Sequence, residues 1–138
     1  MQADFLDAHE RHLADADRLF QAQRWANADH LYGMAAECGL KRLMLVFGMP
    51  FDTNKDRPAK FEDRTHADGI WLRFESYRSG YAQGVGYVLP VTNHFSQWKV
   101  SDRYAHQSNF DQVRAQGHQA GAQAVRSLIA KAQREGLL

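Results

Sequence analysis

Apolar residues recur every three or four positions along most of the chain, which is the spacing of an amphipathic α-helix. The pattern predicts a first helix over about residues 3–21 and a second, longer helix over about residues 25–47. Towards its end the second stretch is apolar nearly all round, which is typical of a central, well-buried helix. Gly48 and Pro50 then end this helix.

Two glycines fall within the second predicted helix. Gly33 and Gly39 each cost about 1 kcal/mol of helix propensity relative to alanine. A common reason to tolerate such a cost is the close approach of another helix, which a Cβ atom would hinder. We therefore expect tight helix packing at these two positions.

Two further helices are predicted in the second half of the chain. The third covers about residues 67–79, where a following glycine stops it. Ser108 and Asn109 are good N-cap residues for a final helix that continues to about Arg134. Between the second and third helices, residues 49–64 are predicted to form a loop without regular structure, and loops of this length are often functional.

The segment after the third helix is rich in glycine and in β-branched residues. Gly80, Gly84 and Gly86 follow no strand and open no long helix, so they do not make a phosphate-binding loop. Residues 85–91 have a strand-like composition, but no second strand exists to pair with them. The whole pattern therefore predicts an all-α fold, an antiparallel up-and-down bundle of four to five helices in a single domain over residues 1–138.

Composition is consistent with one folded domain. The chain has 138 residues, of which 44% are hydrophobic and 24% charged, and its formal net charge is +1. These proportions exclude intrinsic disorder, and the length is typical of one domain. The start of the chain does not resemble a signal peptide, and the longest apolar run, Leu43–Phe47, is far shorter than the roughly 20 residues of a membrane span. We therefore expect a soluble, cytoplasmic protein with no membrane partner.

The charges are unevenly distributed along the chain. Residues 1–30 carry six acids and three bases, whereas residues 103–138 carry five bases and two acids. The basic end can pair with the acidic segment within the fold or across a dimer, or it can face a phosphate group. An acidic ligand should therefore meet a local site near Arg103, not a broad basic surface.

Cysteine and histidine give no sign of a metal centre. The single Cys38 excludes a disulfide framework and, because it lies in the most apolar predicted helix, is favoured as a small core side chain over a nucleophile. His9 with His12, and His66 with Asp68, are short pairs of metal-capable residues. Neither pair supplies the spacing of a structural or catalytic zinc site, so we predict neither a metal nor another cofactor.

Residues 94–106, just before the last helix, combine cationic, aromatic and imidazole side chains. Arg103 has a permanently charged fork suited to phosphate, and the imidazole of His106 can accept a proton near neutral pH. Metal-free cleavage of RNA needs these two chemistries: a base for the ribose 2′-hydroxyl and a cation for the phosphorane charge. On a helical turn both groups would lie on one side. In the structural alternative, Arg103 pairs with Asp102 or with an acid of the first helix, and His106 caps a turn.

Two stretches of the chain carry a family resemblance. Residues 28–41 contain the pattern Ala-x-Glu-x-x-Leu-Lys in the second helix, and Arg103-Tyr104 stands after a loop and ahead of the last helix. Both features resemble the HEPN domain, the helical family named for higher eukaryotes and prokaryotes nucleotide-binding proteins. The order of elements fits over most of the chain, and residues 49–92 match least well.

The resemblance implies a four- or five-helix bundle that forms a homodimer. Active members of the family are metal-independent ribonucleases whose Arg and His come from both subunits, while other members bind nucleotides or partner proteins, including antitoxins. Their catalytic pattern is Arg, four to six residues, then His. Here two residues separate Arg103 from His106, while Arg24 and His30 have the family spacing at a different point in the fold.

Two functional hypotheses follow. The first is a HEPN-like dimeric module that binds a nucleotide, RNA or an antitoxin-type partner protein, as part of a toxin–antitoxin or defence system. Its ligand would contact the surface around Arg103, including Lys99, Asp102 and Tyr104. The alternative is a metal-independent ribonuclease in which Arg103 stabilises phosphate charge and His106 is the general base, across a dimer cleft.

Overall fold

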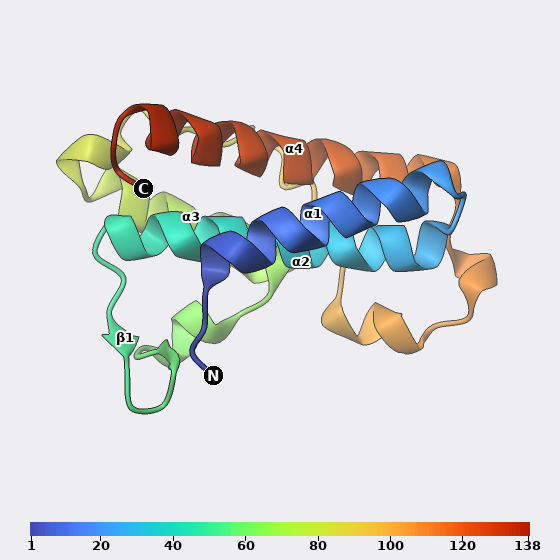
Figure 1. The fold of residues 1–138 in the computed structure, drawn as a ribbon, viewed down its shortest axis with the longest axis horizontal. Helices are drawn as coiled ribbons and strands as arrows, with labels where there is room; N and C mark the ends of the chain where they lie inside the picture. The colour runs from blue at the N-terminus through green and yellow to red at the C-terminus, as the bar shows by residue number, and fades with distance from the viewer.

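The structure is a computed structural model that describes all 138 residues, and it confirms an all-α bundle of four helices (Figure 1). The helices are α1 (Phe5–Gln21), α2 (Trp25–Val46), α3 (Ala67–Ser79) and α4 (Gln112–Arg134). Four short 3-10 helices accompany them: η1 (Phe61–Arg64), η2 (Ala82–Gly84), η3 (Val100–Tyr104) and η4 (Gln107–Asn109). None of the helices combines the length and the hydropathy that crossing a membrane requires.

The start of α4 differs from the sequence-based prediction. Its N-cap is Asp111, whose side chain accepts a hydrogen bond of 2.8 Å from the backbone N–H of Arg114. Ser108 and Asn109, the predicted caps, lie in the separate turn η4. The three residue types are about equally good caps, so composition alone does not distinguish between them.

Residues 49–64 are not wholly irregular, which corrects the sequence-based prediction for this loop. Strands β1 (Phe51–Asp52) and β2 (Arg57–Pro58) form a small antiparallel hairpin, and η1 follows it. The Asp52 carboxylate accepts hydrogen bonds from the backbone N–H groups of Asn54 and Lys55, and Asp56 adopts a positive φ of 50°. Aspartate tolerates both roles, so short polar residues close the turn without a glycine.

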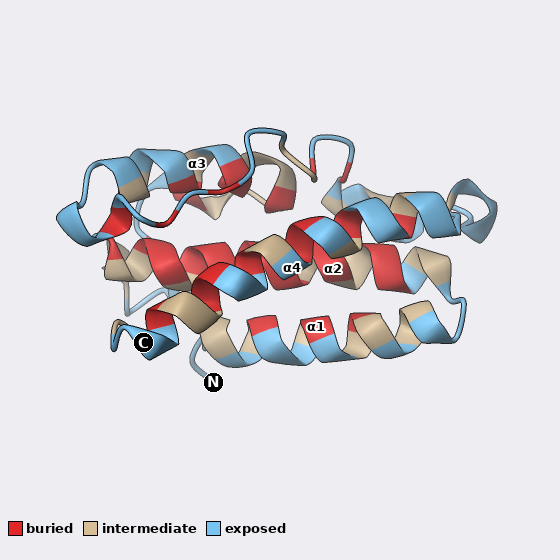
Figure 2. Cartoon of the chain, turned by 90° about the horizontal axis from the view of Figure 1, so that it is seen from above, coloured by how far each residue is buried: buried red, intermediate tan, exposed pale blue.

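Helix α2 is the centre of the bundle, as its all-round apolar pattern predicted. It packs against α1, α3 and α4, and Figure 2 shows it as an almost continuously buried helix flanked by the others. Four of its large side chains are fully buried: Tyr32, Leu40, Leu43 and Met44. Burial of this kind contributes about 1.5–3 kcal/mol for each large apolar side chain, so α2 carries much of the stability of the fold.

Helices α1 and α2 pack side by side in antiparallel directions. The Nδ1 atom of His9, early in α1, lies 2.8 Å from the carbonyl oxygen of Ala35. Further along α1, Asp17 accepts a hydrogen bond of 2.7 Å from Tyr32, which lies earlier in α2. The short turn between the two helices leaves them no other arrangement.

In contrast, α3 and α4 both run parallel to α2. Asp29 of α2 contacts His118 of α4, and further along the same two helices Gly39 lies against Val125. A Cβ atom on Gly39 would stand 2.6 Å from a Val125 methyl group, so the predicted close helix packing is confirmed here. The long connection over residues 80–111 permits this direction, because it crosses back along the bundle before α4 begins.

Helix α3 shows the same register against α2. Its N-cap residue His66 lies 3.1 Å from the Glu37 carboxylate, in the middle of α2. Later in α3, Phe74 packs against Phe47 at the C-terminal end of α2, with ring centroids 6.2 Å apart. The hairpin segment therefore also returns along the bundle, and the strict up-and-down alternation predicted for the four helices applies only to α1 and α2.

Candidate functional site

A cavity of about 470 Å³ lies at the N-terminal end of α2. One side is formed by residues 23–27 and His30, and the other by Asp102, Arg103 and residues 105–108. In Figure 1 this is the right-hand end of the molecule, where the orange η3–η4 segment lies beside the start of α2. We call it the α2 cavity; the two segments that form it are far apart in the sequence.

The α2 cavity brings together four side chains that suit an anionic ligand. Arg103 and His106, the pair predicted from the sequence, both line it. Arg24 and His30 line it as well, although they were placed at the wrong point in the fold for a site with Arg103. The five residues between Arg24 and His30 were the sequence signal for this pair. Only the packing of the start of α2 beside η3 shows that the pair lies in the same cavity as Arg103.

The N-terminus of α2 is itself open to this cavity. Its N-cap residue Arg24 makes no side-chain capping hydrogen bond, and the first turn contains no acid. The backbone N–H groups of Trp25, Ala26 and Asn27, which all line the cavity, have no hydrogen-bond partner in the protein. Unpaired N–H groups and the positive end of the helix dipole together favour an anion at this point.

The proton on His106 is placed by its neighbours. Its Nδ1 atom accepts a hydrogen bond of 3.2 Å from the backbone N–H of Ser108 and lies 2.9 Å from the Ser108 hydroxyl oxygen. The side chain therefore does cap a turn, η4, as the structural alternative proposed. Because Nδ1 accepts, the neutral ring carries its proton on Nε2, which is then a hydrogen-bond donor.

His30, in contrast to His106, is suited to accept a proton. Its ring stacks on the buried Trp98, with centroids 5.5 Å apart and an interplanar angle of 19°. Its Nδ1 atom is buried without a hydrogen-bond partner. Burial lowers the pKa of His30, and the positive charge of Arg103 lowers this pKa further. His30 is therefore neutral at neutral pH and can accept a proton or a hydrogen bond.

The charge of Arg103 is not neutralised by a carboxylate, so the pairing with Asp102 or with an acid of α1 that the structural alternative proposed does not occur. Its guanidinium lies over the ring of Tyr104, 4.7 Å from the centroid, and donates a hydrogen bond of 2.9 Å to the Tyr104 hydroxyl. Tyr104 is 77% exposed and, like Lys99, does not line the cavity. Among the predicted ligand contacts, only Asp102 lines it.

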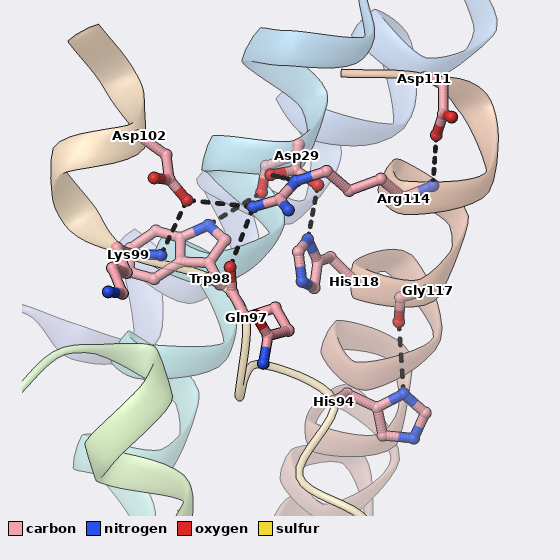
Figure 3. A network of polar contacts seen from close by, with 10 residues as sticks. All are labelled: Asp29, His94, Gln97, Trp98, Lys99, Asp102, Asp111, Arg114, Gly117 and His118. Atoms are coloured by element: carbon pink, nitrogen blue, oxygen red, sulfur yellow. Dashed lines mark hydrogen bonds and ion pairs between the residues drawn. The ribbon is translucent and has the colours of Figure 1, made fainter. Parts of the chain in front are cut away.

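Behind the cavity, Asp29 holds a buried polar network together (Figure 3). Its side chain is only 1% exposed, and one carboxylate oxygen accepts a hydrogen bond of 2.5 Å from Nδ1 of His118. The other oxygen lies 3.4 Å from Nε of Arg114. The backbone carbonyl of Asp29 accepts a hydrogen bond of 3.2 Å from the Trp98 indole. The network ties α2 to α4 and to the segment that leads into η3.

No group of three or more His, Cys, Asp or Glu side chains is arranged to hold a metal ion. Cys38 is buried, and burial raises the pKa of its thiol to about 12, with Glu37 adding to the effect. A thiol with such a pKa is not a nucleophile at neutral pH. Cys38 is therefore a core side chain, as the sequence favoured.

Comparisons with protein-family models, with curated proteins and with solved structures found no match to this chain. The chemistry that the α2 cavity can support therefore follows from its own residues. Two arginines without carboxylate partners, an Nε2–H donor on His106 and an open helix N-terminus surround one space. Such a combination is suited to the oxygens of a phosphate group.

Proposed function

We propose that this protein binds a phosphate group of a nucleotide or of RNA in the α2 cavity. The observation that carries the proposal is that Arg24 and Arg103 face one cavity with no carboxylate bound to either, at the open N-terminus of α2. Asp102 is the one acid that lines the cavity, and its carboxylate is already engaged by Arg114. The charge of the two arginines thus remains available to a ligand.

The family resemblance is part of the same proposal. Four helices, with Arg103-Tyr104 ahead of the last one, support a HEPN-like module. A homodimer, and an antitoxin-type protein partner that would regulate such a module, follow from that resemblance. The proposed ligand depends only on the cavity of a single chain, so its test does not require the dimer.

The proposal predicts that Arg103→Ala weakens phosphate binding. A charge-assisted hydrogen bond contributes about 1.5–3 kcal/mol, so the dissociation constant should rise roughly ten- to a hundredfold. The measurement is fluorescence anisotropy with a short, labelled single-stranded RNA, with ADP as competitor. Arg11→Ala is the matched control, because Arg11 lies on α1 outside the cavity and is 56% exposed. Equal affinities of the two variants would contradict the proposed site.

A second candidate function is metal-independent cleavage of RNA, which the two dissimilar imidazoles of the cavity favour. In this reaction the neutral His30 removes the proton of a ribose 2′-hydroxyl, and the resulting oxygen attacks phosphorus. The P–O5′ bond breaks, and the leaving oxygen takes the Nε2 proton of His106 in its imidazolium form, which returns His106 to the neutral ring. Arg103 offsets the added negative charge on the phosphorane. His106 would thus be the acid, in place of the base predicted from the sequence.

This candidate predicts RNA fragments with 2′,3′-cyclic phosphate ends in the presence of EDTA. Both His30→Gln and His106→Gln should lower the cleavage rate by roughly a hundredfold or more, which is the usual contribution of general acid–base catalysis. His94→Gln is the control, because His94 lies outside the cavity. Mass spectrometry of the products is the measurement. Binding without any cyclic ends would leave only the binding function.

A further inference from the structure

Two carboxylates stand directly beside cavity residues in the sequence: Asp29 precedes His30, and Asp102 precedes Arg103. One side chain, Arg114 of α4, contacts both of them (Figure 3). Its Nε atom lies 3.4 Å from Asp29, and a terminal nitrogen donates a hydrogen bond of 3.0 Å to Asp102. A single guanidinium therefore connects the two sides of the α2 cavity from behind.

The position of Arg114 is fixed by its other contacts. The same terminal nitrogen donates to the carbonyl oxygen of Gln97 over 3.1 Å, and the guanidinium lies 5.4 Å from the centroid of the Phe110 ring. Its backbone N–H is bound by the N-cap residue Asp111. Arg114 does not line the cavity, so it would not touch a ligand there.

Asp102, in contrast, does line the cavity. Apart from Arg114, its carboxylate accepts only the backbone N–H of Lys99, at 3.0 Å. Without Arg114, a negative charge next to Arg103 would lack a cationic partner and would repel a phosphate group. The segment that carries Arg103 would also lose its ionic connection to Asp29 on α2.

We propose that Arg114 is a positioning residue for the phosphate site: it neutralises Asp102 and holds η3 against α2, so that Arg103 and His30 face the same ligand. The proposal rests on the phosphate-binding function proposed above. It adds a residue outside the cavity whose contribution depends on the charge of Asp102. Because Asp102 provides that charge, removal of the Asp102 charge should change how much Arg114 contributes to phosphate binding.

The test is a double-mutant cycle of Arg114→Met and Asp102→Asn, with the labelled single-stranded RNA as probe. Arg114→Met should weaken binding about tenfold with Asp102 present, but no more than about threefold in the Asp102→Asn background. Asparagine can still accept the hydrogen bond from Lys99, so the turn keeps its backbone contact. The same tenfold loss for Arg114→Met in the Asp102→Asn background as with Asp102 present would show that Arg114 only supports the fold, and would overturn the proposal.

Arg114→Lys provides a second variant if Arg114→Met does not fold. Lysine keeps one positive charge but lacks the planar fork that reaches two carboxylates at once. Its loss of affinity should be smaller than that of Arg114→Met and should also disappear in the Asp102→Asn background. Equal losses in both backgrounds would contradict the proposal. If the unsubstituted protein does not bind the RNA probe, the phosphate-binding function itself is wrong; if it binds and only the rescue fails, only the role of Arg114 is wrong.

Discussion

Replacement of Asp29 by alanine is expected to lower the free energy of unfolding by about 3–5 kcal/mol, because it removes one partner from a buried charged network. The His118 ring, 6% exposed, would lose its 2.5 Å hydrogen bond, and Arg114 would lose its contact with α2. Water cannot replace these partners where the carboxylate is only 1% exposed. Urea unfolding followed by circular dichroism measures the loss.

Asp7→Ala is the matched control for this prediction. Asp7 forms an ion pair of 3.3 Å with Arg11, but both side chains are more than half exposed, at 67% and 56%. Pairs of this kind contribute about 0–1 kcal/mol, because water screens them. A loss for Asp29→Ala as small as that for Asp7→Ala would show that the network does not hold α2, α4 and η3 together.

Replacement of Gly33 by alanine is expected to destabilise the protein by roughly 3 kcal/mol, the upper end of the usual cost of overpacking a core. A Cβ atom at this position would overlap the indole ring of Trp98, which is fully buried and donates a hydrogen bond to the Asp29 carbonyl. The ring would have to move, and His30, which stacks on it, would move with it. Both the unfolding free energy and RNA binding should therefore fall.

Gly117→Ala gives the opposite expectation and serves as the control. Gly117 also lies within a helix, α4, but no atom stands within 4 Å of the position that its Cβ would take. Alanine should therefore stabilise the protein here by about 1 kcal/mol, through helix propensity alone. Thermal and urea unfolding of the two variants compare them directly. Stabilisation by Gly33→Ala as well would contradict the tight contact with Trp98.

The four long helices could be predicted from the sequence because their signal is local. Apolar spacing located each of them to within a few residues, and the tolerated glycine at Gly39 correctly indicated close packing against α4. The direction of α3 and α4 has no such local signal. It depends on the path of the connections over residues 47–66 and 80–111, and periodicity within a helix is the same in either direction.

The candidate site could be predicted only in part, for a similar reason. Arg103 and His106 stood out because they lie close together in the sequence with suitable chemistry. Arg24 and His30 belong to the same cavity, but only the folded chain brings the start of α2 to η3. The burial of Asp29 could not be predicted from the sequence either. Its hydrogen-bond partner His118 lies on α4, and only the folded chain brings α4 next to Asp29.

The hydrogen bond between Asp29 and His118 joins residues 89 positions apart. Contacts of such separation form late in folding, because the entropy of closing a long segment must be overcome first. On the ribosome, α2 and its turn would emerge well before α4 is synthesised, with Asp29 still lacking its partners. The second side of the α2 cavity is formed by side chains from the segment 102–108, so a chain that ends before this segment would carry the arginine and histidine of α2 without the proposed phosphate site.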